Sequence, residues 1–272
     1  MFVSSVLETI GATAQNKIRS RRMYQHLEAL DPALHGHLRY DPEAGYAFAA
    51  NVSVCLLAPF EVPEAAKEYP VVFSSSRPCL PQVLLYAGHG RHPYISPSGK
   101  WLGRYIPAML RSYPFILGAQ EDSDTSEDFV LMTDIKAPHF LTGRGKQLFT
   151  PEGSPGDLLE AKIQILRKFL KGLQLAKAFL APLRDGDFFS DDPLLVRDRN
   201  DSGLELQGFA TVRPPALGAL DPRILSAMAQ NGLLGMFYAH QHSLTNLAPI
   251  LRASGGVVAV DPDLGRNLPG LG

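Results

Sequence analysis

Residues 63–73 read PEAAKEYPVVF, and residues 107–117 repeat the same pattern as PAMLRSYPFIL. The two stretches align without a gap, and each places a proline first and a Tyr-Pro pair before three apolar residues. Proline is well tolerated in the first helical turn, and it disfavours helical backbone in the residue before it. Each stretch therefore predicts a short helix that ends near the tyrosine and passes directly into an extended segment.

The match continues through a second apolar segment in each copy, and a Gly-Lys turn follows it. Apolar residues at every position of a short run are typical of buried strands. We interpret residues 63–102 and 107–148 as weakly duplicated helix-strand-strand units. The aligned apolar segments are Val71–Phe73 with Phe115–Leu117 and Val83–Leu85 with Val130–Met132.

Helical spacing of apolar residues dominates the C-terminal half of the chain. One apolar face predicts a helix over residues 157–181, and Asp221-Pro222 can cap a second helix that ends near Gly232. A final helix is expected from about residue 234 to residue 252. The apolar residues of the first helix include Leu159, Ile163, Leu166, Leu170 and Leu173.

The remaining segments predict strands and loops. Strands are expected at residues 46–48, 52–57 and 204–212, and a loop rich in Asp, Gly, Arg and Pro is expected at residues 185–203. Together these elements predict an α+β fold. In it, a mostly antiparallel sheet built from the two units is covered by the C-terminal helices.

The chain divides into a central domain and two flanking segments. Residues 5–8 have the form of a capping box and predict a helix over residues 6–22, so we interpret residues 1–29 as a helical extension. Residues 30–252 form a single predicted domain. Residues 253–272 are rich in Gly and Pro without periodicity, which predicts a flexible tail.

Composition restricts the class of protein. The chain has 272 residues, of which 45% are hydrophobic and 19% charged, as in a water-soluble globular protein. A net charge of -1 gives no overall attraction to nucleic acid, so no nucleic-acid partner is expected. No run is apolar enough for a transmembrane segment, and the N-terminus lacks the apolar core of a secretory signal, which favours a cytoplasmic location.

No catalytic motif is recognisable, so the sequence leaves open whether the chain is an enzyme and favours a noncatalytic role. Gly99-Lys100 and Gly145-Lys146 lack the glycine spacing and the following Ser or Thr of a phosphate-binding loop. Cys55 and Cys79 lie in apolar surroundings, which is typical of buried free thiols. Ser74-Ser75-Ser76 is interpreted as a polar strand end, since no Gly-x-Ser-x-Gly motif surrounds it.

Histidines occur in pairs, which raises the question of a metal site. His240 and His242 lie two residues apart in a predicted helix, where side chains at that spacing point about 200° apart. Such a pair does not bind one ion from a regular helix. We expect no metal and no cofactor.

The stretch from Trp101 to Tyr105, WLGRY, holds the densest group of side chains that are typical of binding sites. Trp, Arg and Tyr combine large area with directional polar groups and dominate binding hot spots. The same residues also make half-buried joints between strands and helices, and the sequence leaves both interpretations open.

Several short segments of the chain together follow the pattern of one known family. They are YAFA at 46–49, EAAKEYPVVF at 64–73, GKW at 99–101, RYIPA at 104–108, RSYPF at 111–115, GF at 208–209 and YAHQHSLTN at 238–246. On these segments the chain resembles the bacterial SapC family, over roughly residues 30–252. The resemblance implies an association with the bacterial surface layer and therefore a cell-surface setting. It supplies no catalytic residues, although His240 and Asn246 match the family pattern.

Two functional hypotheses follow. The first is a noncatalytic binding or assembly protein that resembles the SapC proteins of the surface layer. The alternative is a small-molecule-binding protein or enzyme with a pocket near Trp101, Arg104, Tyr105, Arg111 and His240. The sequence leaves the partner open between a protein, a small molecule and further copies of the chain. The predicted binding residues are Trp101, Arg104, Tyr105, Arg111, His240 and Asn246.

Overall fold

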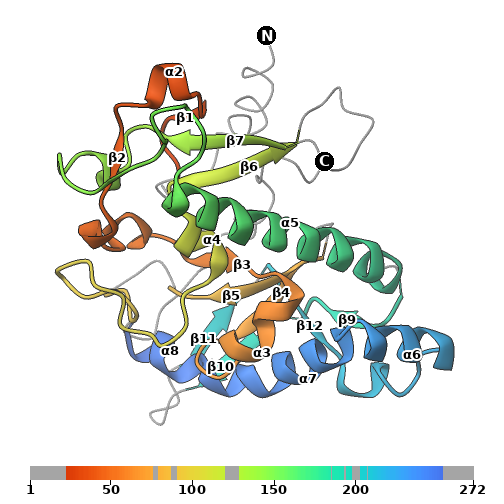
Figure 1. Cartoon of the computed structure of the whole chain (residues 1–272). Helices are drawn as coiled ribbons and strands as arrows, with labels where there is room; N and C mark the ends of the chain where they lie inside the picture. The colour runs from red at the N-terminus through yellow and green to blue at the C-terminus, as the bar shows by residue number, and fades with distance from the viewer. Residues whose placement is uncertain are drawn as a thin grey trace, which may run out of the picture.

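The structure, a computed structural model, describes residues 23–75, 79–86, 91–119, 129–184, 186–192, 194–197, 203–206 and 208–253. Helices and antiparallel strands both contribute to it, so the fold is α+β, as predicted (Figure 1). The predicted N-terminal helix over residues 6–22 and all of the predicted tail over residues 253–272 except Ala253, which ends a helix, lie outside the described residues.

A five-stranded antiparallel sheet with the strand order β3-β5-β4-β12-β9 forms one layer of the fold. Its central strand β4 is buried at all four positions, because both of its faces are covered. This confirms the prediction of a buried strand after Tyr69-Pro70. The strands are β3 (Val54–Leu56), β4 (Val71–Ser74), β5 (Pro81–Leu84), β9 (Phe189–Ser190) and β12 (Phe209–Val212).

A three-stranded antiparallel sheet with the order β1-β7-β6 forms a second layer. Strand β1 (Leu27–Ala29) lies at its edge and pairs with β7 (Phe129–Asp134), and β6 (Phe115–Ala119) pairs with the other side of β7. Residues 27–29 are therefore part of the folded domain. Two further strand pairs are β2 (Arg39–Tyr40) with β8 (Lys146–Gln147) and β10 (Leu194–Arg197) with β11 (Gly203–Leu206).

The long helix α5 (Asp157–Arg184) connects the two layers and confirms the helix predicted from residue 157 (Figure 1). Leu159, Ile163 and Leu166 in its first half pack in one core cluster with Phe115 and Leu117 of β6. Phe169, Leu173, Ala176 and Leu180 in its second half join the main core with the five-stranded sheet. One apolar stripe therefore serves two cores in succession.

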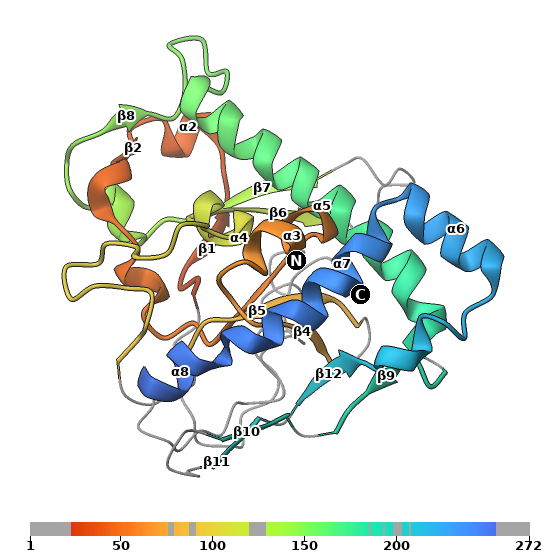
Figure 2. The same cartoon turned by 90° about the horizontal axis from the view of Figure 1, so that it is seen from below.

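The C-terminal helices cover the five-stranded sheet. Helix α7 (Leu233–Ser243) packs against β4 and β12 and against the short helix α3 (Val62–Ala65), and Figure 2 shows it running across the strands. Helix α6 (Pro222–Gln230) precedes it, and the Asp221 carboxylate caps α6 by accepting from the amide of Arg223 at 2.7 Å. This confirms the predicted cap.

Short elements complete the described chain. They are the α-helices α2 (Pro32–His35), α4 (Ala108–Ser112) and α8 (Ala248–Ala253), and the 3-10 helices η1 (Pro42–Ala44), η2 (Ala47–Ala49), η3 (Pro59–Glu61), η4 (Pro138–Phe140), η5 (Pro214–Ala216) and η6 (Leu244–Leu247).

Each of the two related units forms a short helix followed by an antiparallel hairpin. The first unit contributes α3, β4 and β5 to the five-stranded sheet, and the second contributes α4, β6 and β7 to the three-stranded sheet. The carbonyl of Pro70 accepts from the amide of Leu84 at 2.9 Å, and the carbonyl of Pro114 accepts from Asp134 at 3.0 Å. The duplication itself stays a prediction, because a helix followed by a hairpin is a common arrangement.

The strand register corrects part of the predicted alignment between the units. Val71 pairs with Val83, and Phe115 pairs with Thr133. Val83 therefore corresponds to Thr133 and not to Val130, a difference of three positions. The reason is that the six-residue β7 extends farther towards its hairpin than the four-residue β5.

Three local predictions were wrong. The strand expected at residues 46–48 is the 3-10 helix η2, preceded by its N-cap residue Tyr46. The rings of Tyr46 and Phe48 pack against the main core. The loop expected at residues 185–203 contains β9 and β10, which form because β12 and β11 supply their hydrogen bonds. The single strand expected at residues 204–212 is two strands, β11 and β12, and Gly208 between them has a φ of 82°.

Candidate functional site

Trp101 lies at the centre of the predicted site and is buried, with 7% of its surface exposed. Its indole Nε1–H lies 3.2 Å from the Tyr69 hydroxyl and 3.1 Å from the carbonyl oxygen of Tyr105. The Tyr69 hydroxyl in turn donates to that same carbonyl. The indole N–H of Trp101, the single tryptophan of the chain, therefore fixes the backbone at Tyr105 by a hydrogen bond.

Glu68 fixes the backbone on the other side of this loop. One oxygen of its carboxylate accepts from the amide of Arg104 at 2.8 Å and from the amide of Tyr105 at 3.2 Å. Gly103 completes the contact, since a Cβ atom there would lie 2.1 Å from the Tyr69 hydroxyl and 2.8 Å from Trp101 Nε1. The loop approaches these polar groups so closely that only glycine fits.

Glu61 anchors the end of the same segment and is buried, with 1% of its surface exposed. Its carboxylate accepts from the Tyr105 hydroxyl and the Ala108 amide, both at 2.7 Å, and from the Ala58 amide at 2.9 Å. Burial raises the pKa of Glu61, and these hydrogen bonds and the charge of Arg111 oppose that rise. A buried carboxylate thus joins η3, Tyr105 and the start of α4.

The side chains at the surface of this loop are those of Leu102 and Arg104. Leu102 is 55% exposed, and Arg104 is also exposed although its backbone amide is held by Glu68. Hydrogen bonds to Tyr69 and Glu68 thus hold the loop from Trp101 to Tyr105, and the loop presents an apolar and a cationic side chain to solvent.

Arg111 lies beside Tyr105, with its guanidinium carbon 5.8 Å from the centroid of the Tyr105 ring. Its Nε atom is buried and has no hydrogen-bond partner among the described residues. Trp101, Tyr105 and Arg111 are thus linked through shared contacts, and their role in binding stays a prediction.

His240 and Asn246 make a different set of contacts, between the C-terminal helices and the first unit. His240 is fully buried, its Nδ1 lies 2.7 Å from the carbonyl oxygen of Val71, and its Nε2 accepts from the Val212 amide at 3.1 Å. The Val212 contact places the ring proton on Nδ1, which donates to Val71, and burial lowers the pKa of His240 to about 4. Asn246 donates to the carbonyl of Ala66 at 2.8 Å. Both residues tie α7 and η6 to the core.

The Gly-Lys pairs and both thiols are structural, as predicted. Gly99 and Gly145 have φ values of 81° and 104°, which are those of tight turns. Cys55 and Cys79 are free and buried. Burial raises the pKa of the Cys79 thiol to about 12, which removes its nucleophilic thiolate at neutral pH.

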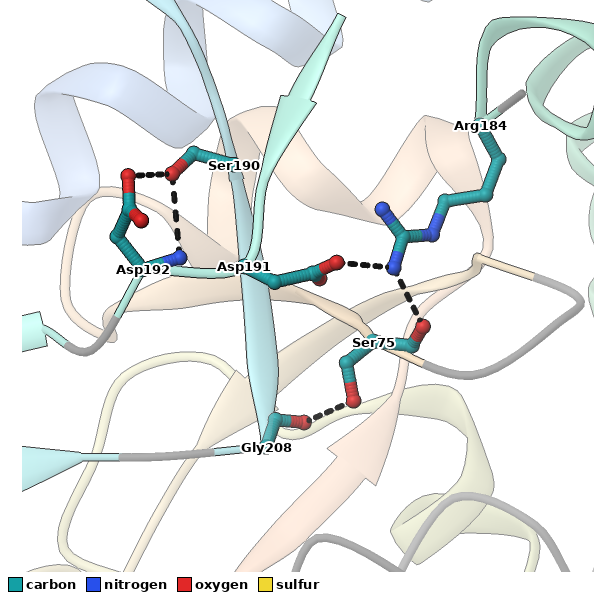
Figure 3. A network of polar contacts seen from close by, with 6 residues as sticks. All are labelled: Ser75, Arg184, Ser190, Asp191, Asp192 and Gly208. Carbon is teal, nitrogen blue, oxygen red and sulfur yellow. Dashed lines mark hydrogen bonds and ion pairs between the residues drawn. The ribbon is translucent and has the colours of Figure 1, made fainter. Parts of the chain in front are cut away.

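The predicted polar strand end at Ser75 joins three elements, as Figure 3 shows. The Arg184 guanidinium donates to the Ser75 carbonyl at 2.7 Å and to the Asp191 carboxylate, and the Ser75 hydroxyl donates to the Gly208 carbonyl at 2.9 Å. Nearby, the Ser190 hydroxyl donates to Asp192. These contacts close the end of the sheet between α5, β4 and β12 and use the Ser75 hydroxyl as a structural donor. Ser76 lies outside the described residues.

Within the described ranges, no three His, Cys, Asp or Glu side chains converge as they would to bind a metal ion. No helix in the described part of the chain is both long and apolar enough to span a membrane.

Comparison with known proteins identifies the family. Residues 30–250 match the SapC family. The chain belongs to the SapC family. No curated protein and no solved structure matches it. The segments on which the SapC resemblance rests also meet in space, because Glu68 binds the backbone at Arg104 and Tyr105, and Ser243 accepts from the Val71 amide at 2.8 Å.

Sequence reasoning missed several residues of this SapC site. The sequence predicts Tyr69 only as a helix end and gives no role to Glu61 or Lys162. Glu68 lies in the EAAKEYPVVF segment of the family resemblance, but it too has no predicted role. A signal existed for Glu61, which follows Ala58-Pro59-Phe60 at the third position of η3, where a glutamate can bind a free amide at the helix start. The other partners lie too far away in sequence for any local pattern.

Proposed function

We propose that this SapC protein is a noncatalytic binding or assembly protein of the bacterial surface layer. The observation that carries the proposal is the loop from Trp101 to Tyr105, which is anchored by hydrogen bonds to Tyr69 and Glu68 and presents Leu102 and Arg104 outwards. Membership of the SapC family supports the surface-layer setting.

A fixed loop suits a protein contact for a thermodynamic reason. Ordering a mobile segment on binding costs free energy, and a segment that is already ordered avoids that cost. Apolar and Arg side chains then contribute area and directional hydrogen bonds to the contact. The anchoring contacts of Trp101 and Glu68 therefore support recognition without touching the partner.

Co-sedimentation with cell envelopes tests this proposal. The purified chain is mixed with envelopes of its source bacterium that carry an intact surface layer, or with envelopes stripped of that layer. We expect the chain to sediment only with the intact envelopes. Leu102→Asp and Arg104→Glu should each reduce the bound fraction about tenfold, an effect typical of contact residues at the centre of an interface.

Leu34→Asp is the matched control, because Leu34 is 67% exposed on α2, outside the Trp101–Tyr105 loop. It should bind like the unmodified chain. Equal sedimentation with stripped and intact envelopes would contradict the surface-layer proposal. Unchanged binding by Leu102→Asp and Arg104→Glu would show that the loop is not the contact.

A second candidate is a small-molecule-binding protein or an enzyme, with its site at Tyr105 and Arg111. The specific observation in its favour is the buried Arg111 Nε, which has no hydrogen-bond partner within the described ranges. In this candidate Trp101 positions Tyr105, Arg104 lies at the rim, and His240 supports the strand that follows Tyr69. Saturable binding of a small anion that depends on Arg111 tests it.

A further inference from the structure

Arg111 and Lys162 bring two positive charges together where α4 packs against α5 (Figure 1). Arg111 lies in the last turn of α4, and Lys162 lies in the first half of α5. The Lys162 ammonium donates to the backbone carbonyl of Arg111 and to the Tyr40 hydroxyl, the latter at 3.2 Å. It also lies 4.9 Å from the centroid of the Tyr40 ring.

Among the carboxylates of the described residues, that of Glu61 interacts with the charge of Arg111, but at more than ion-pair distance. None of their carboxylates forms an ion pair with Arg111 or Lys162. Burial, and secondly the positive charge of Arg111, lower the pKa of Lys162 to about 8. Two partly buried like charges oppose each other, so an anion placed between them stabilises both.

Glu61 does not fill this role, although the charge of Arg111 reaches it. The Glu61 carboxylate already accepts from the Tyr105 hydroxyl and from the amides of Ala58 and Ala108. Its hydrogen bonds are therefore directed at η3 and at the start of α4.

Donors for an external anion remain on both cations. Lys162 has three N–H groups and uses two of them. The guanidinium of Arg111 has five N–H groups, of which part serves the Tyr105 side chain, while its buried Nε has no partner in the described chain. The half-buried Tyr46 side chain is also close enough to interact with the charge of Arg111. Burial raises the pKa of Tyr46, and the positive charge of Arg111 partly opposes that rise. A guanidinium fork, an ammonium and a phenol form a donor set suited to carboxylate or phosphate oxygens.

We propose that Arg111 and Lys162 bind an oxyanion group, a carboxylate or a phosphate, that bridges the guanidinium and the ammonium. The inference deepens the second candidate function and rests on it. It does not involve Leu102 or Arg104, so the surface-layer proposal stands or fails separately.

Isothermal titration calorimetry on the full chain tests the site with two probes in low-salt buffer. Acetate represents the carboxylate group, and sulfate represents the tetrahedral phosphate group. We expect saturable binding of at least one probe, and Arg111→Gln and Lys162→Gln should each weaken it about tenfold, as expected when one partner of a charge-assisted contact is lost. Lys171→Gln removes the same charge from an exposed position of α5 and should leave the affinity within about twofold, since exposed charges contribute little.

A second measurement needs no variant. A bound anion raises the pKa of Lys162, so binding at pH 8 should take up a fraction of a proton, which titrations in buffers of different ionisation enthalpy detect. The titratable and charged groups near Lys162 and its partner Tyr40 are Arg111, Tyr40, Tyr46, Asp41 and His139. The pKa of His139 is lowered to about 4 and those of both tyrosines are raised, so these three groups do not titrate near pH 8, whereas the pKa of Lys162 is about 8.

The outcomes separate the hypotheses. Tighter binding of sulfate supports a phosphate ligand, and tighter binding of acetate supports a carboxylate ligand. The site is overturned if neither probe saturates, if all three variants bind like the unmodified chain, or if binding at pH 8 takes up no proton. Normal sedimentation with intact envelopes in that case would leave the surface-layer proposal standing.

Discussion

Two neighbouring groups of polar residues, joined by α4, differ in how completely they are paired. In the acidic anchor, formed by Glu61 and Glu68, each carboxylate accepts at least two hydrogen bonds from the loop or from α4. In the cation pair, formed by Arg111 and Lys162, like charges meet and Arg111 Nε lacks a partner within the described chain. Paired groups specify a structure, whereas an unpaired buried group needs an explanation, and a bound ion or ligand is one of them.

The difference has a geometric origin. The segment from Arg104 to Ala108 lies between a turn and a helix start, where amides have no strand or helix partner, and the carboxylates satisfy them. The cations instead lie at the end of α4, where Lys162 binds the carbonyl of Arg111. A cation at a helix C-terminus is favourable, but here the positive charge of Arg111 acts on the ammonium and lowers the pKa of Lys162.

The largest effect is expected from breaking the acidic anchor with Glu61→Ala. The amides of Ala58 and Ala108 and the Tyr105 hydroxyl lose their acceptor in a buried site, and such unsatisfied groups cost about 1–3 kcal/mol each. We expect the free energy of unfolding, measured by urea denaturation, to fall by about 3 kcal/mol. Glu64→Ala is the control, because the Glu64 side chain is 60% exposed and pairs only with exposed Lys67. A loss below about 1 kcal/mol for Glu61→Ala would show that the anchor is not needed for stability.

An intermediate effect on the free energy of unfolding is expected when the pH is lowered, because His240 is buried with both ring nitrogens hydrogen-bonded. Its pKa is about 4 in the folded chain, whereas an unfolded histidine has a pKa of about 6.5. Below pH 6.5 the unfolded chain takes up a proton that the folded chain does not, so stability is complete above that pH and is lost towards pH 4. Between pH 7 and pH 5 this one group should lower the free energy of unfolding by about 2 kcal/mol.

Urea denaturation at both pH values measures this loss. His240→Gln should reduce the difference between pH 7 and pH 5 by about 2 kcal/mol, whatever its effect at pH 7. His242→Gln changes an exposed imidazole on the same helix and should keep the full difference. His92 and His139, whose pKa values burial also lowers to about 4, account for further loss in all three proteins. An unchanged difference in His240→Gln would contradict the neutral, paired state of this residue.

Local patterns predicted most of the fold. The apolar stripe of α5, the cap of α6 and the buried strand β4 follow from residues that are close in sequence. Strand β9 was missed because Phe189-Ser190 is followed by two aspartates and a proline, and it becomes a strand only through pairing with β12. Tyr46 and Phe48 alternate like strand residues, but Tyr46 precedes a 3-10 helix and Phe48 lies in it. The Tyr46 ring packs against Trp101, and the Phe48 ring packs against Tyr113.

The candidate site was predicted in part. Trp101, Tyr105 and Arg111 stood out because they are large and polar at their tips, and they lie together. Their partners could not be predicted, since Glu68 precedes Arg104 by 36 residues and Lys162 follows Arg111 by 51. His240 and Asn246 were singled out by family resemblance, and they hold α7 and η6 to the first unit.

The smallest effect is expected from Lys162→Met in the cation pair. The substitution loses hydrogen bonds to the Tyr40 hydroxyl and the Arg111 carbonyl, but it removes a partly buried charge that Arg111 opposes. Because these changes offset each other, the free energy of unfolding at pH 7 should change by less than about 1 kcal/mol in ligand-free buffer. Lys171→Met, on the exposed side of α5, provides the baseline for losing a lysine from this helix. A loss above about 2 kcal/mol would place Lys162 with Glu61 among the structural groups, and the contrast between the two clusters would no longer favour a ligand at the cation pair.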